Sequence, residues 1–498
     1  MFAAGTRRIC RVGLAAVLVT ALCVLTLVDL PPQLPDPPPD PPPTADGESP
    51  GTRSIVAYSW ARRLALDYRP SSECARNGSV ETTLNAFEFN GKEWLETIPG
   101  RLFLYSAHLD LRVVGYPSVR VIGVKRGSLR TSALFCTIWY KDQGRIRSFS
   151  MEALISDIWL DEWGGSTETY TGILVTCPLA TALNPSRVVV SATSCAENPS
   201  HSLVVNSASR NSRGRRQFTM CIKGLDFEED ISRKLVAFVE LHRLLGAKFF
   251  YFYVFSVHQN VLKVLRLYER SNVVRWVTLS LPGDLPKEKL ARRQLLSDDV
   301  WIKRRMELIP YNHCFYENLY HSEFVIPIDI DETIVPARRK DWTQVMLDER
   351  KKLGRSFKDF ASYSVRNAYF FLELQKKSPI PNSTLDSDIF HNLNYLDTLR
   401  IATVSPEGDS VKSFISTKRA LTVHNHYALT TLNPSTRRAH HLDPKDILKH
   451  HHRVCDDRHL DCDLLMENVQ VDESALRYAK ELMTRMKIVL ADLNAFIE

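Results

Sequence analysis

The chain has 498 residues, of which 44% are hydrophobic and 24% are charged, and this is the composition of an ordinary globular protein. At about 150 residues per domain, the length predicts two or three domains. The net charge of +7, from 64 basic and 57 acidic residues, is mild for this length and argues against a nucleic-acid partner.

The N-terminus predicts a membrane anchor. Three arginines within the first 11 residues precede the uncharged stretch "VGLAAVLVTALCVLTLV", residues 12–28. As a helix this stretch spans roughly 26 Å at about 1.5 Å per residue, close to the thickness of an endoplasmic reticulum bilayer. A cleaved signal peptide is the alternative, but its apolar region is usually about 7–15 residues long. We predict a cytoplasmic tail at 1–11 and a transmembrane signal anchor at 12–30, which places the rest of the chain in the lumen.

The next segment, 31–54, contains "PPQLPDPPPDPPPTADGESPG". Proline removes amide donors and fixes φ, so this segment favours extended polyproline II and cannot build a core. We predict a semi-rigid stem between the anchor and a folded body. A disordered tail is the alternative.

Cysteines and sequons fit a lumenal body. Eight of the ten cysteines follow the anchor, and in an oxidising compartment they can form disulfides, whose pairing the sequence does not give. Cys455 and Cys462 are close enough for a local bridge. A zinc site in "HHHRVCDDRHLDC" is the alternative, but its spacings match no standard zinc finger. Sequons predict glycosylation at Asn77 and Asn382.

Residues 55–206 predict a β-rich accessory domain. The stretches "RLFLYSAHLDLR", "SVRVIGV", "ALFCTIWY", "TGILVTC" and "SRVVVSA" are rich in β-branched and aromatic residues, and turn residues separate them. No acid or histidine cluster stands out in this region. The polar, basic stretch "SASRNSRGRR" predicts a linker at 207–216.

From residue 217 to 498 the pattern predicts an α/β catalytic domain. The strand-like stretches "FTMCIKG", "KFFYFYVF", "NVVRWVTL" and "FVIPIDID" alternate with helical ones. The first helix, "DISRKLVAFVELHRLLG", has Asp230 as a plausible N-cap and Gly246 as a C-terminal stop. Such alternation predicts a mostly parallel sheet covered on both faces, which binds ligands outside the carboxyl ends of its strands. The C-terminal stretch "ESALRYAKELMTRMKIVLADLNAF" predicts a helix with an apolar face.

The stretch "FVIPIDIDETIVP" places Asp329, Asp331 and Glu332 at the end of an apolar strand. Buried strands do not carry such acids without a positive partner. In the turn that leaves the strand, the two aspartates can converge on one Mg²⁺, Mn²⁺ or Ca²⁺ ion, because hard carboxylate oxygens suit these ions. Such an ion can stabilise charge on a leaving diphosphate. In a lumenal α/β protein the pair indicates a sugar-nucleotide transferase. The alternative is a solvated turn whose acids cap the next element.

From about residue 219 to 453 the chain resembles the family 92 glycosyltransferases, lumenal enzymes with a type A glycosyltransferase fold. The resembling stretches are "CIKG", "LVAFVELHRLLGAKFFYFYVFS", "HCFYENLYHSEFVIPIDIDETIVP", "KSFISTKRALTVHNH" and "HHHRVC", in the same order and spacing. "YSAHLDLR" and "VRVIGV" resemble the family's N-terminal portion. The resemblance implies an inverting, Mn²⁺- or Mg²⁺-dependent transfer from a UDP-sugar. It further implies UDP-galactose and a β1,4 linkage to glycoprotein glycans, in a single-pass type II Golgi membrane protein.

The resemblance also implies residue roles. Asp329 would face the nucleotide sugar and adjoin the metal, Asp331 would bind the metal, and Glu332 would orient the loop or the ribose. "CIKG" would end the first strand beside the uridine, which places Cys221 and Lys223 among the donor-binding residues. Lys223 can pair with phosphate there, and an exposed lysine without that role is the simpler alternative.

The histidine that completes the metal shell stays open. His424, in "TVHNH", matches a family histidine, and His426, His451 and His452 are alternatives. His452 stands where the family usually has tyrosine.

The general base and the donor also stay open. Inversion needs a base that takes the proton of the acceptor hydroxyl, and the candidates are Asp386, Asp388 and Asp397. UDP-glucose and UDP-N-acetylglucosamine are alternative donors. Enzymes distinguish such sugars through a few polar groups that contact one hydroxyl, and the sequence does not identify these groups. A lumenal glycan-binding module with a degenerate catalytic site is the alternative from another class.

Overall fold

The computed structural model describes residues 72–74, 93–114, 116–129, 133–142, 145–166, 168–179, 184–196, 201–207, 214–375, 393–456 and 460–495. The predicted tail, anchor and stem lie outside these residues. So do Asn77 and Asn382 of the two sequons, and Asp386 and Asp388 among the candidate bases. Within the described residues, no helix has the length and hydrophobicity needed to cross a membrane.

The first large sheet is built from ten strands of the region before residue 207. Their order is β1-β6-β5-β9-β10-β3-β4-β8-β7, with β2 paired to β3, and all pairs are antiparallel except β10 with β3. The strands are β1 (Ser72–Glu73), β2 (Leu95–Ile98), β3 (Leu102–Asp110), β4 (Ser118–Arg126), β5 (Phe135–Asp142), β6 (Arg145–Glu152), β7 (Leu154–Asp157), β8 (Tyr170–Pro178), β9 (Pro185–Ser191) and β10 (Leu203–Asn206). All five stretches that the sequence predicts as strands are strands.

This sheet faces two separate cores. Successive side chains of a strand point to opposite faces, so Leu104 of β3 lies in one core and Tyr105 in the other. The core around Leu104 also holds residues of β5, β6 and β9, and the disulfide Cys136–Cys177 joins β5 to β8, which is not its neighbour. The core around Tyr105 is shared with helix α5 (Val300–Glu317). The β-rich region is therefore packed directly on the part of the chain that follows it.

The second large sheet has the order β13-β12-β11-β14-β19-β16-β22. The first four strands of this order are parallel, β19 is antiparallel to both neighbours, and β22 is parallel to β16. The strands are β11 (Arg216–Asp226), β12 (Phe249–Ser256), β13 (Val274–Thr278), β14 (Ser322–Ile328), β16 (Phe360–Val365), β19 (Lys412–Ser416) and β22 (Arg437–His441). The predicted mixed α/β fold is confirmed.

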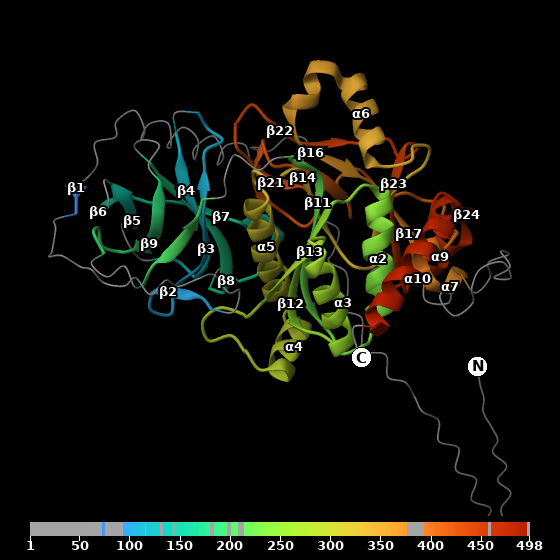
Figure 1. The fold of residues 1–498 in the computed structure, drawn as a ribbon, viewed down its shortest axis with the longest axis horizontal. Coiled ribbons are helices and arrows are strands. Elements are labelled where there is room, and N and C mark those ends of the chain that lie inside the picture. The colour runs from blue at the N-terminus through green and yellow to red at the C-terminus, as the bar shows by residue number, and fades with distance from the viewer. Residues whose placement is uncertain are drawn as a thin grey trace, which may run out of the picture. The chain divides into compact units, whose positions relative to one another are not determined.

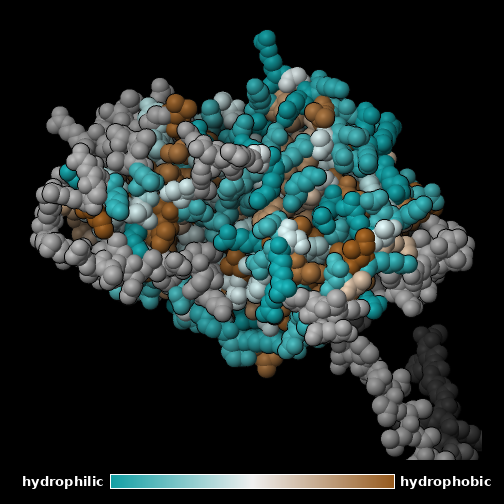
Figure 2. All heavy atoms as spheres, viewed as in Figure 1, coloured by the Kyte–Doolittle hydropathy of each residue, from teal (hydrophilic) through white to brown (hydrophobic). Residues whose placement is uncertain are grey.

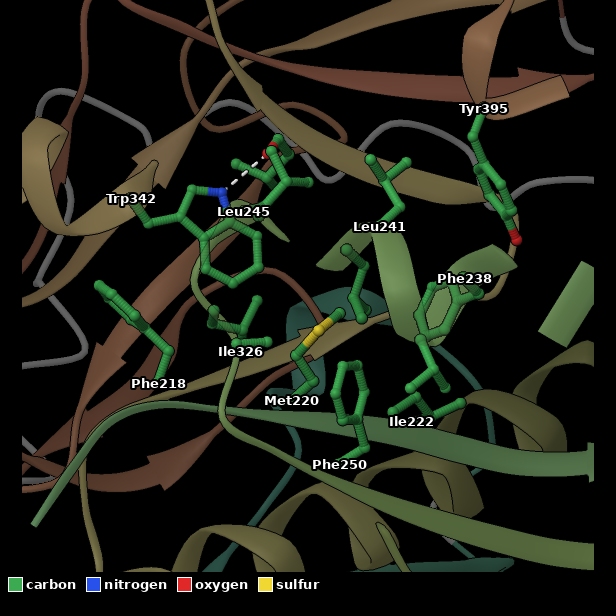
Figure 3. Close-up of a cluster of buried hydrophobic side chains, with 14 of the residues drawn as sticks. Phe218, Met220, Ile222, Phe238, Leu241, Leu245, Phe250, Ile326, Trp342 and Tyr395 are labelled. Carbon is green, nitrogen blue, oxygen red and sulfur yellow. Dashed lines mark hydrogen bonds between the residues drawn. The ribbon is translucent and has the colours of Figure 1, made fainter. Parts of the chain in front are cut away.

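Helices lie on both faces of this sheet. Figure 3 shows Met220 and Ile326 of the sheet facing Phe238 and Leu241 of α2, with the Trp342 indole donating to the Ile334 carbonyl. On the other face, α5 lies between the two large sheets (Figure 1). The longer helices are α2 (Ser232–Leu245), α3 (Gln259–Arg270), α4 (Lys289–Asp298), α5, α6 (Trp342–Leu353) and α10 (Ala479–Ala495).

Small sheets position the segments around the end of β14. The order β15-β23-β17 sets β15 antiparallel to β23 and places Glu332 opposite His451. The remaining elements are β15 (Glu332–Pro336), β17 (Asn367–Phe371), β18 (Leu399–Ile401), β20 (Ala420–Val423), β21 (Ala428–Thr431), β23 (Ile447–Arg453), β24 (Val469–Val471), α7 (Leu372–Gln375), α9 (Cys462–Glu467) and the 3₁₀ turns η1 (Asp161–Trp163), η3 (Gly354–Asp359), η5 (Asn394–Leu396) and η6 (Leu476–Tyr478).

The predicted C-terminal end of α2 is confirmed, and the predicted N-cap is wrong by one residue. Gly246 ends the helix with φ of 124°, where the left-handed region favours glycine. The predicted N-cap Asp230 is one residue too early, because Ile231 occupies that position. The Asp230 carboxylate still accepts a hydrogen bond of 3.0 Å from the Ser232 amide, so it satisfies one of the free amides at this end.

Four disulfides use all eight cysteines that follow the predicted anchor. The predicted local bridge Cys455–Cys462 is confirmed, and it takes both thiols away from any metal. Another bond joins Cys221 of β11 to Cys314 of α5. The complete set is Cys74–Cys195, Cys136–Cys177, Cys221–Cys314 and Cys455–Cys462.

Figure 2 shows one face of the molecule, on which the coloured atoms are mostly hydrophilic and the hydrophobic ones form small separate groups. Large exposed hydrophobic side chains come from different elements, as Leu290 of α4, Leu347 of α6 and Ile488 of α10 illustrate. Single hydrophobic residues of this kind are normal on protein surfaces.

Candidate active site

The three predicted acids lie in the turn after β14 and at the first position of β15. Residues 329–332 are called the acidic loop below. Two hydrogen bonds close it. The Glu332 amide donates to the Asp329 carbonyl at 3.1 Å, and the Asp329 amide donates to Glu332 Oε2 at 3.1 Å. Glu332 thus fixes the loop with both its backbone and its side chain.

Three lysines are the positive partners that these buried acids require. Lys412 Nζ lies 2.9 Å from Asp329 Oδ2 and 3.2 Å from Glu332 Oε2. Lys449 Nζ lies 2.6 Å from Glu332 Oε1, and Lys223 Nζ lies 3.1 Å from Asp329 Oδ1. Burial alone would raise the pKa of Asp329, but Lys223 and Lys412 hold this pKa well below its usual range. Asp329 and Glu332 are therefore charged and compensated within the protein.

The predicted donor-binding residues of β11 lie in structural contacts. The side chain of Lys223 bridges Asp329 to Glu307 of α5, with 3.1 Å to each carboxylate. Cys221 is fully buried, and its sulfur is bonded to Cys314. The Cys221 side chain therefore joins β11 to α5.

Asp331 differs from its two acidic neighbours. Its side chain is 37% exposed, and its carboxylate lies 3.4 Å from His451 Nε2. Within the described part of the chain, His451 is the only basic side chain within 4 Å of this carboxylate. Burial would raise the pKa of Asp331, but the His451 ring lowers it to about 2. The acidic loop thus presents one charged carboxylate outward, beside an imidazole.

The other candidate histidines have different surroundings. The His424 ring packs on Trp163 with 4.6 Å between centroids, and His426 Nδ1 lies 2.7 Å from the Val411 carbonyl. Burial lowers the pKa of His424 well below its usual range and that of His426 to about 3, so both rings are neutral. Among the described residues, no third histidine, cysteine or acid brings a ligand atom within 4.8 Å of both Asp331 and His451.

Asp397 is the one described member of the three candidate bases. It follows η5, and its Oδ2 lies 3.6 Å from His452 Nδ1. Burial raises the pKa of Asp397 to about 8, and the nearby Lys234 ammonium opposes this shift. The His452 amide donates to the Asp331 carbonyl at 2.9 Å, so Asp397 is connected to the acidic loop through one residue. Lys234 also interacts with both Asp331 and Asp397.

Lys412, Lys449 and Lys234 were not predicted from the sequence. In the structure every residue of the strand "ILKHHHR", which contains Lys449, is buried, and so is every residue of the strand "KSFIS", which begins with Lys412. A buried lysine requires an acid. Neither stretch shows this burial in its sequence, because "ILKHHHR" is typical of a basic surface segment.

In α/β proteins ligands bind beyond the carboxyl ends of the parallel strands, and the acidic loop lies at such an end of β14. The sequence profile described as Glycosyltransferase family 92 matches residues 216–493, which is more than half of the chain. The chain belongs to this family, and it is therefore a glycosyltransferase that takes a sugar donor and a glycan acceptor. A comparison with curated proteins found no match. The family match begins at the first residue of β11 and leaves out the first large sheet.

Proposed function

We propose that the chain is an inverting, metal-dependent glycosyltransferase with a type A fold, which transfers galactose from UDP-galactose to a terminal sugar of a glycoprotein glycan in a β1,4 linkage. Family membership supports the reaction class, and the order of the seven-stranded sheet supports the fold. The single observation that carries the site is the contrast within the acidic loop. Asp329 is compensated by lysines, whereas the Asp331 side chain is 37% exposed and has, among the described residues, one histidine and no lysine or arginine within ion-pair distance.

The residues at the end of β14 fit a divalent metal ion. A carboxylate oxygen and an imidazole nitrogen are suitable ligands for Mn²⁺, and two protein ligands leave positions for phosphate oxygens and water. We assign the metal to Asp331 and His451 and not to Asp329, because Lys223 and Lys412 occupy both Asp329 oxygens. When bound, the ion supplies positive charge to the diphosphate that leaves the sugar.

Asp397 is the general base in this proposal. Its carboxylate takes the proton of the acceptor hydroxyl, the acceptor oxygen forms a bond to the anomeric carbon, and the bond from that carbon to UDP breaks. A pKa of about 8 suits a base that works near neutral pH. His452 and Lys234 flank this carboxylate and connect it to the metal-binding end of the acidic loop.

We also propose a single-pass type II topology in the Golgi membrane, with residues 12–30 as the anchor and the body in the lumen. The uncharged stretch after three arginines supports the anchor. The four disulfides support an oxidising compartment. Removal of N-glycans from the cell-expressed protein should increase its electrophoretic mobility, because both sequons follow the anchor. An unchanged mobility would contradict glycosylation at Asn77 and Asn382.

The deciding experiment is a donor screen on the chain from residue 55 onward. UDP release is measured with Mn²⁺, with each UDP-sugar in turn, and with galactose-terminated or fucose-bearing acceptors. We expect acceptor-dependent release from UDP-galactose, its loss in EDTA, and a β1,4 linkage in the product. Release from UDP-glucose or UDP-N-acetylglucosamine alone would overturn the donor assignment. Glycan binding without UDP release from any donor would favour the inactive binding module.

A further inference from the structure

A second group of metal-ligand side chains lies between the first large sheet and α5. His108 comes from β3, and His313 and Glu317 lie one turn apart on α5. His108 Nδ1 is 3.7 Å from Glu317 Oε1, and His313 Nε2 is 3.8 Å from the same oxygen. One ligand atom from each of the three residues lies within 4.8 Å of the other two. We call these residues the inter-sheet cluster.

Hydrogen bonds hold the two imidazole rings of this cluster. His108 Nε2 lies 3.0 Å from Ser106 Oγ, and His313 Nδ1 lies 2.5 Å from Tyr253 Oη. With a proton on each of these nitrogens, the other nitrogen of each ring carries its lone pair toward Glu317. His108 Nδ1 makes no hydrogen bond with any described residue, although His108 is only 2% exposed. Metal-binding histidines are oriented in this way by a hydrogen bond from their second nitrogen.

From this geometry we propose that the inter-sheet cluster binds Zn²⁺ through His108 Nδ1, His313 Nε2 and a Glu317 carboxylate oxygen. Ligands about 2.0–2.1 Å from one zinc ion lie roughly 3.3–3.6 Å from each other. The two separations to Glu317 therefore need to contract by only a few tenths of an ångström, and the ligand atoms of His108 and His313 lie within 4.8 Å of each other. Two imidazoles and one carboxylate form a known zinc ligand set, which leaves a fourth position for water. Oxygen ligands alone would instead suit magnesium or calcium.

The electrostatic surroundings suit a cation. Both rings are almost fully buried, and a neutral imidazole is the form that binds a metal ion. The Glu317 carboxylate brings the negative charge. Its other contacts are the Asn206 amide, which donates to Oε1 at 2.6 Å, and Arg275, whose guanidinium lies 3.9 Å from Oε2.

The carboxylate is the most accessible member of the cluster. The Glu317 side chain is 14% exposed, whereas His108 and His313 are almost fully buried. A cluster that functions only through hydrogen bonds is the competing explanation, in which Glu317 accepts from Asn206 and the two rings fill space.

The role that follows is structural. His108 precedes the family match and His313 lies within it, so a bound ion would join the first large sheet to the catalytic part of the chain. This site shares no ligand with the proposed catalytic metal site at Asp331 and His451. The two sites can therefore be tested separately, whatever the donor sugar proves to be.

The test measures bound zinc in the full chain after incubation with ZnSO₄ and removal of free metal. To isolate the cluster, we use Asp331→Asn, which removes the proposed catalytic ligand, as the starting protein. We expect one zinc per chain, and a fall of at least tenfold in affinity on adding His108→Gln or Glu317→Gln. The matched control is His440→Gln, because the His440 and Glu349 pair is 2.8 Å apart without a third ligand among the described residues.

A second readout remains if a variant fails to fold. Co²⁺ in place of Zn²⁺ gives intense visible absorption in a four-coordinate site with nitrogen and oxygen ligands, and this is measured on the Asp331→Asn protein alone. Zinc should also raise its melting temperature, because an ion that binds only the folded state stabilises it. If the His108→Gln and Glu317→Gln variants bind zinc as tightly as the Asp331→Asn starting protein, the proposal is overturned. The absence of both stoichiometric zinc and the cobalt spectrum would also overturn it.

Discussion

Asp329 and Asp331 are two residues apart in one loop, yet they have opposite electrostatic environments. The Asp329 side chain is 19% exposed and contacts two lysines, whereas the Asp331 side chain is 37% exposed and contacts one imidazole. The same residue type in the same motif therefore serves two purposes. The compensated acid holds the loop, and we propose that the more exposed acid binds an external cation.

Desolvation explains why the two environments must differ. A carboxylate taken out of water is costly unless it is paired and hydrogen-bonded. Asp329 and Glu332 meet this condition through the buried lysines 412 and 449. Asp331 keeps access to water and so needs no permanent partner. Substitutions of four residues, Lys412, Asp331, Asp397 and Lys223, test this difference between the acids.

The largest effect should follow the loss of Lys412. Its side chain is fully buried and contacts both Asp329 and Glu332, so Lys412→Met leaves two buried carboxylates short of a cation. We expect a loss of about 3–5 kcal/mol in the free energy of unfolding, the usual cost of breaking a buried pair. Urea denaturation measures it. A loss below about 1 kcal/mol would show that the lysine does not neutralise these acids in the folded state.

Asp331→Asn should abolish catalysis without harming the fold. Asparagine keeps the shape but removes the charge that binds the metal, so we expect transfer to fall by about 10³-fold, or about 4 kcal/mol in the activation barrier. The melting temperature in metal-free buffer should not fall. Asp329→Asn is the matched control, because it should lower stability by leaving Lys412 and Lys223 short of a partner. An active Asp331→Asn variant that melts earlier would mean that Asp331 is only a cap.

The sequence was informative about this contrast only in part. The acids of the loop follow directly from a local pattern, an apolar strand that ends in Asp-x-Asp. Their partners come from strands 83 and 117 residues further along the chain, and the pairing of distant strands is not visible in one sequence. His108 was overlooked for the same reason, because its partners His313 and Glu317 belong to a distant helix and meet it only through the packing of β3 on α5.

The fold could be predicted more fully than the site, because strands and helices follow from the hydrophobic periodicity of each segment. The alternation of strands and helices after residue 217 is a local property of each segment, and it predicted β11, α2, β12, α3, β13 and β14 in order. The packing of the first sheet on α5 was not predicted. The strands β3, β4 and β8 alternate their side chains between two cores. The apolar pattern of a strand shows that both of its faces are buried but does not show which elements cover them.

Asp397→Asn tests the other poorly compensated acid. The proposed base would be lost, so we expect transfer to fall by about 10²-fold at every pH. In the unchanged protein, activity should rise with pH up to about 8, the pKa of Asp397, since the base must be deprotonated. Rates measured from pH 6 to 9 check both statements. An activity that is independent of pH in this range would remove Asp397 from the role.

Stability should respond to the same substitution with the opposite sign. The folded protein holds the Asp397 proton up to about pH 8, whereas the unfolded chain releases it near its ordinary pKa of about 3.9. Folding therefore binds a proton between these values, and the free energy of unfolding should fall as pH rises through this window. Asp397→Asn should flatten this decline and raise the melting temperature at pH 8. His452→Gln, which keeps Asp397, should retain the decline.

The smallest effect should follow the loss of Lys223, which contacts the same carboxylate as Lys412 from a more exposed position. Its side chain is 27% exposed, and after Lys223→Met the Asp329 carboxylate still has Lys412. Glu307 loses its partner but can be hydrated, because its own side chain is 17% exposed. We therefore expect a loss of about 1 kcal/mol or less, the range of ion pairs that water reaches. Urea denaturation of the Lys223→Met and Lys412→Met variants measures both losses, and so compares the two lysines that contact Asp329.

The donor kinetics of Lys223→Met complete this comparison. Lys223 is already engaged by Glu307 and Asp329, so a direct contact with the diphosphate would require it to leave one of them. We expect the KM for the UDP-sugar to change by less than about threefold, since a lost charge-assisted hydrogen bond to phosphate would cost about 1.5–3 kcal/mol and raise KM more than tenfold. A tenfold rise with unchanged stability would instead place Lys223 on the donor phosphate, and the exposed member of the lysine group would then be functional as well.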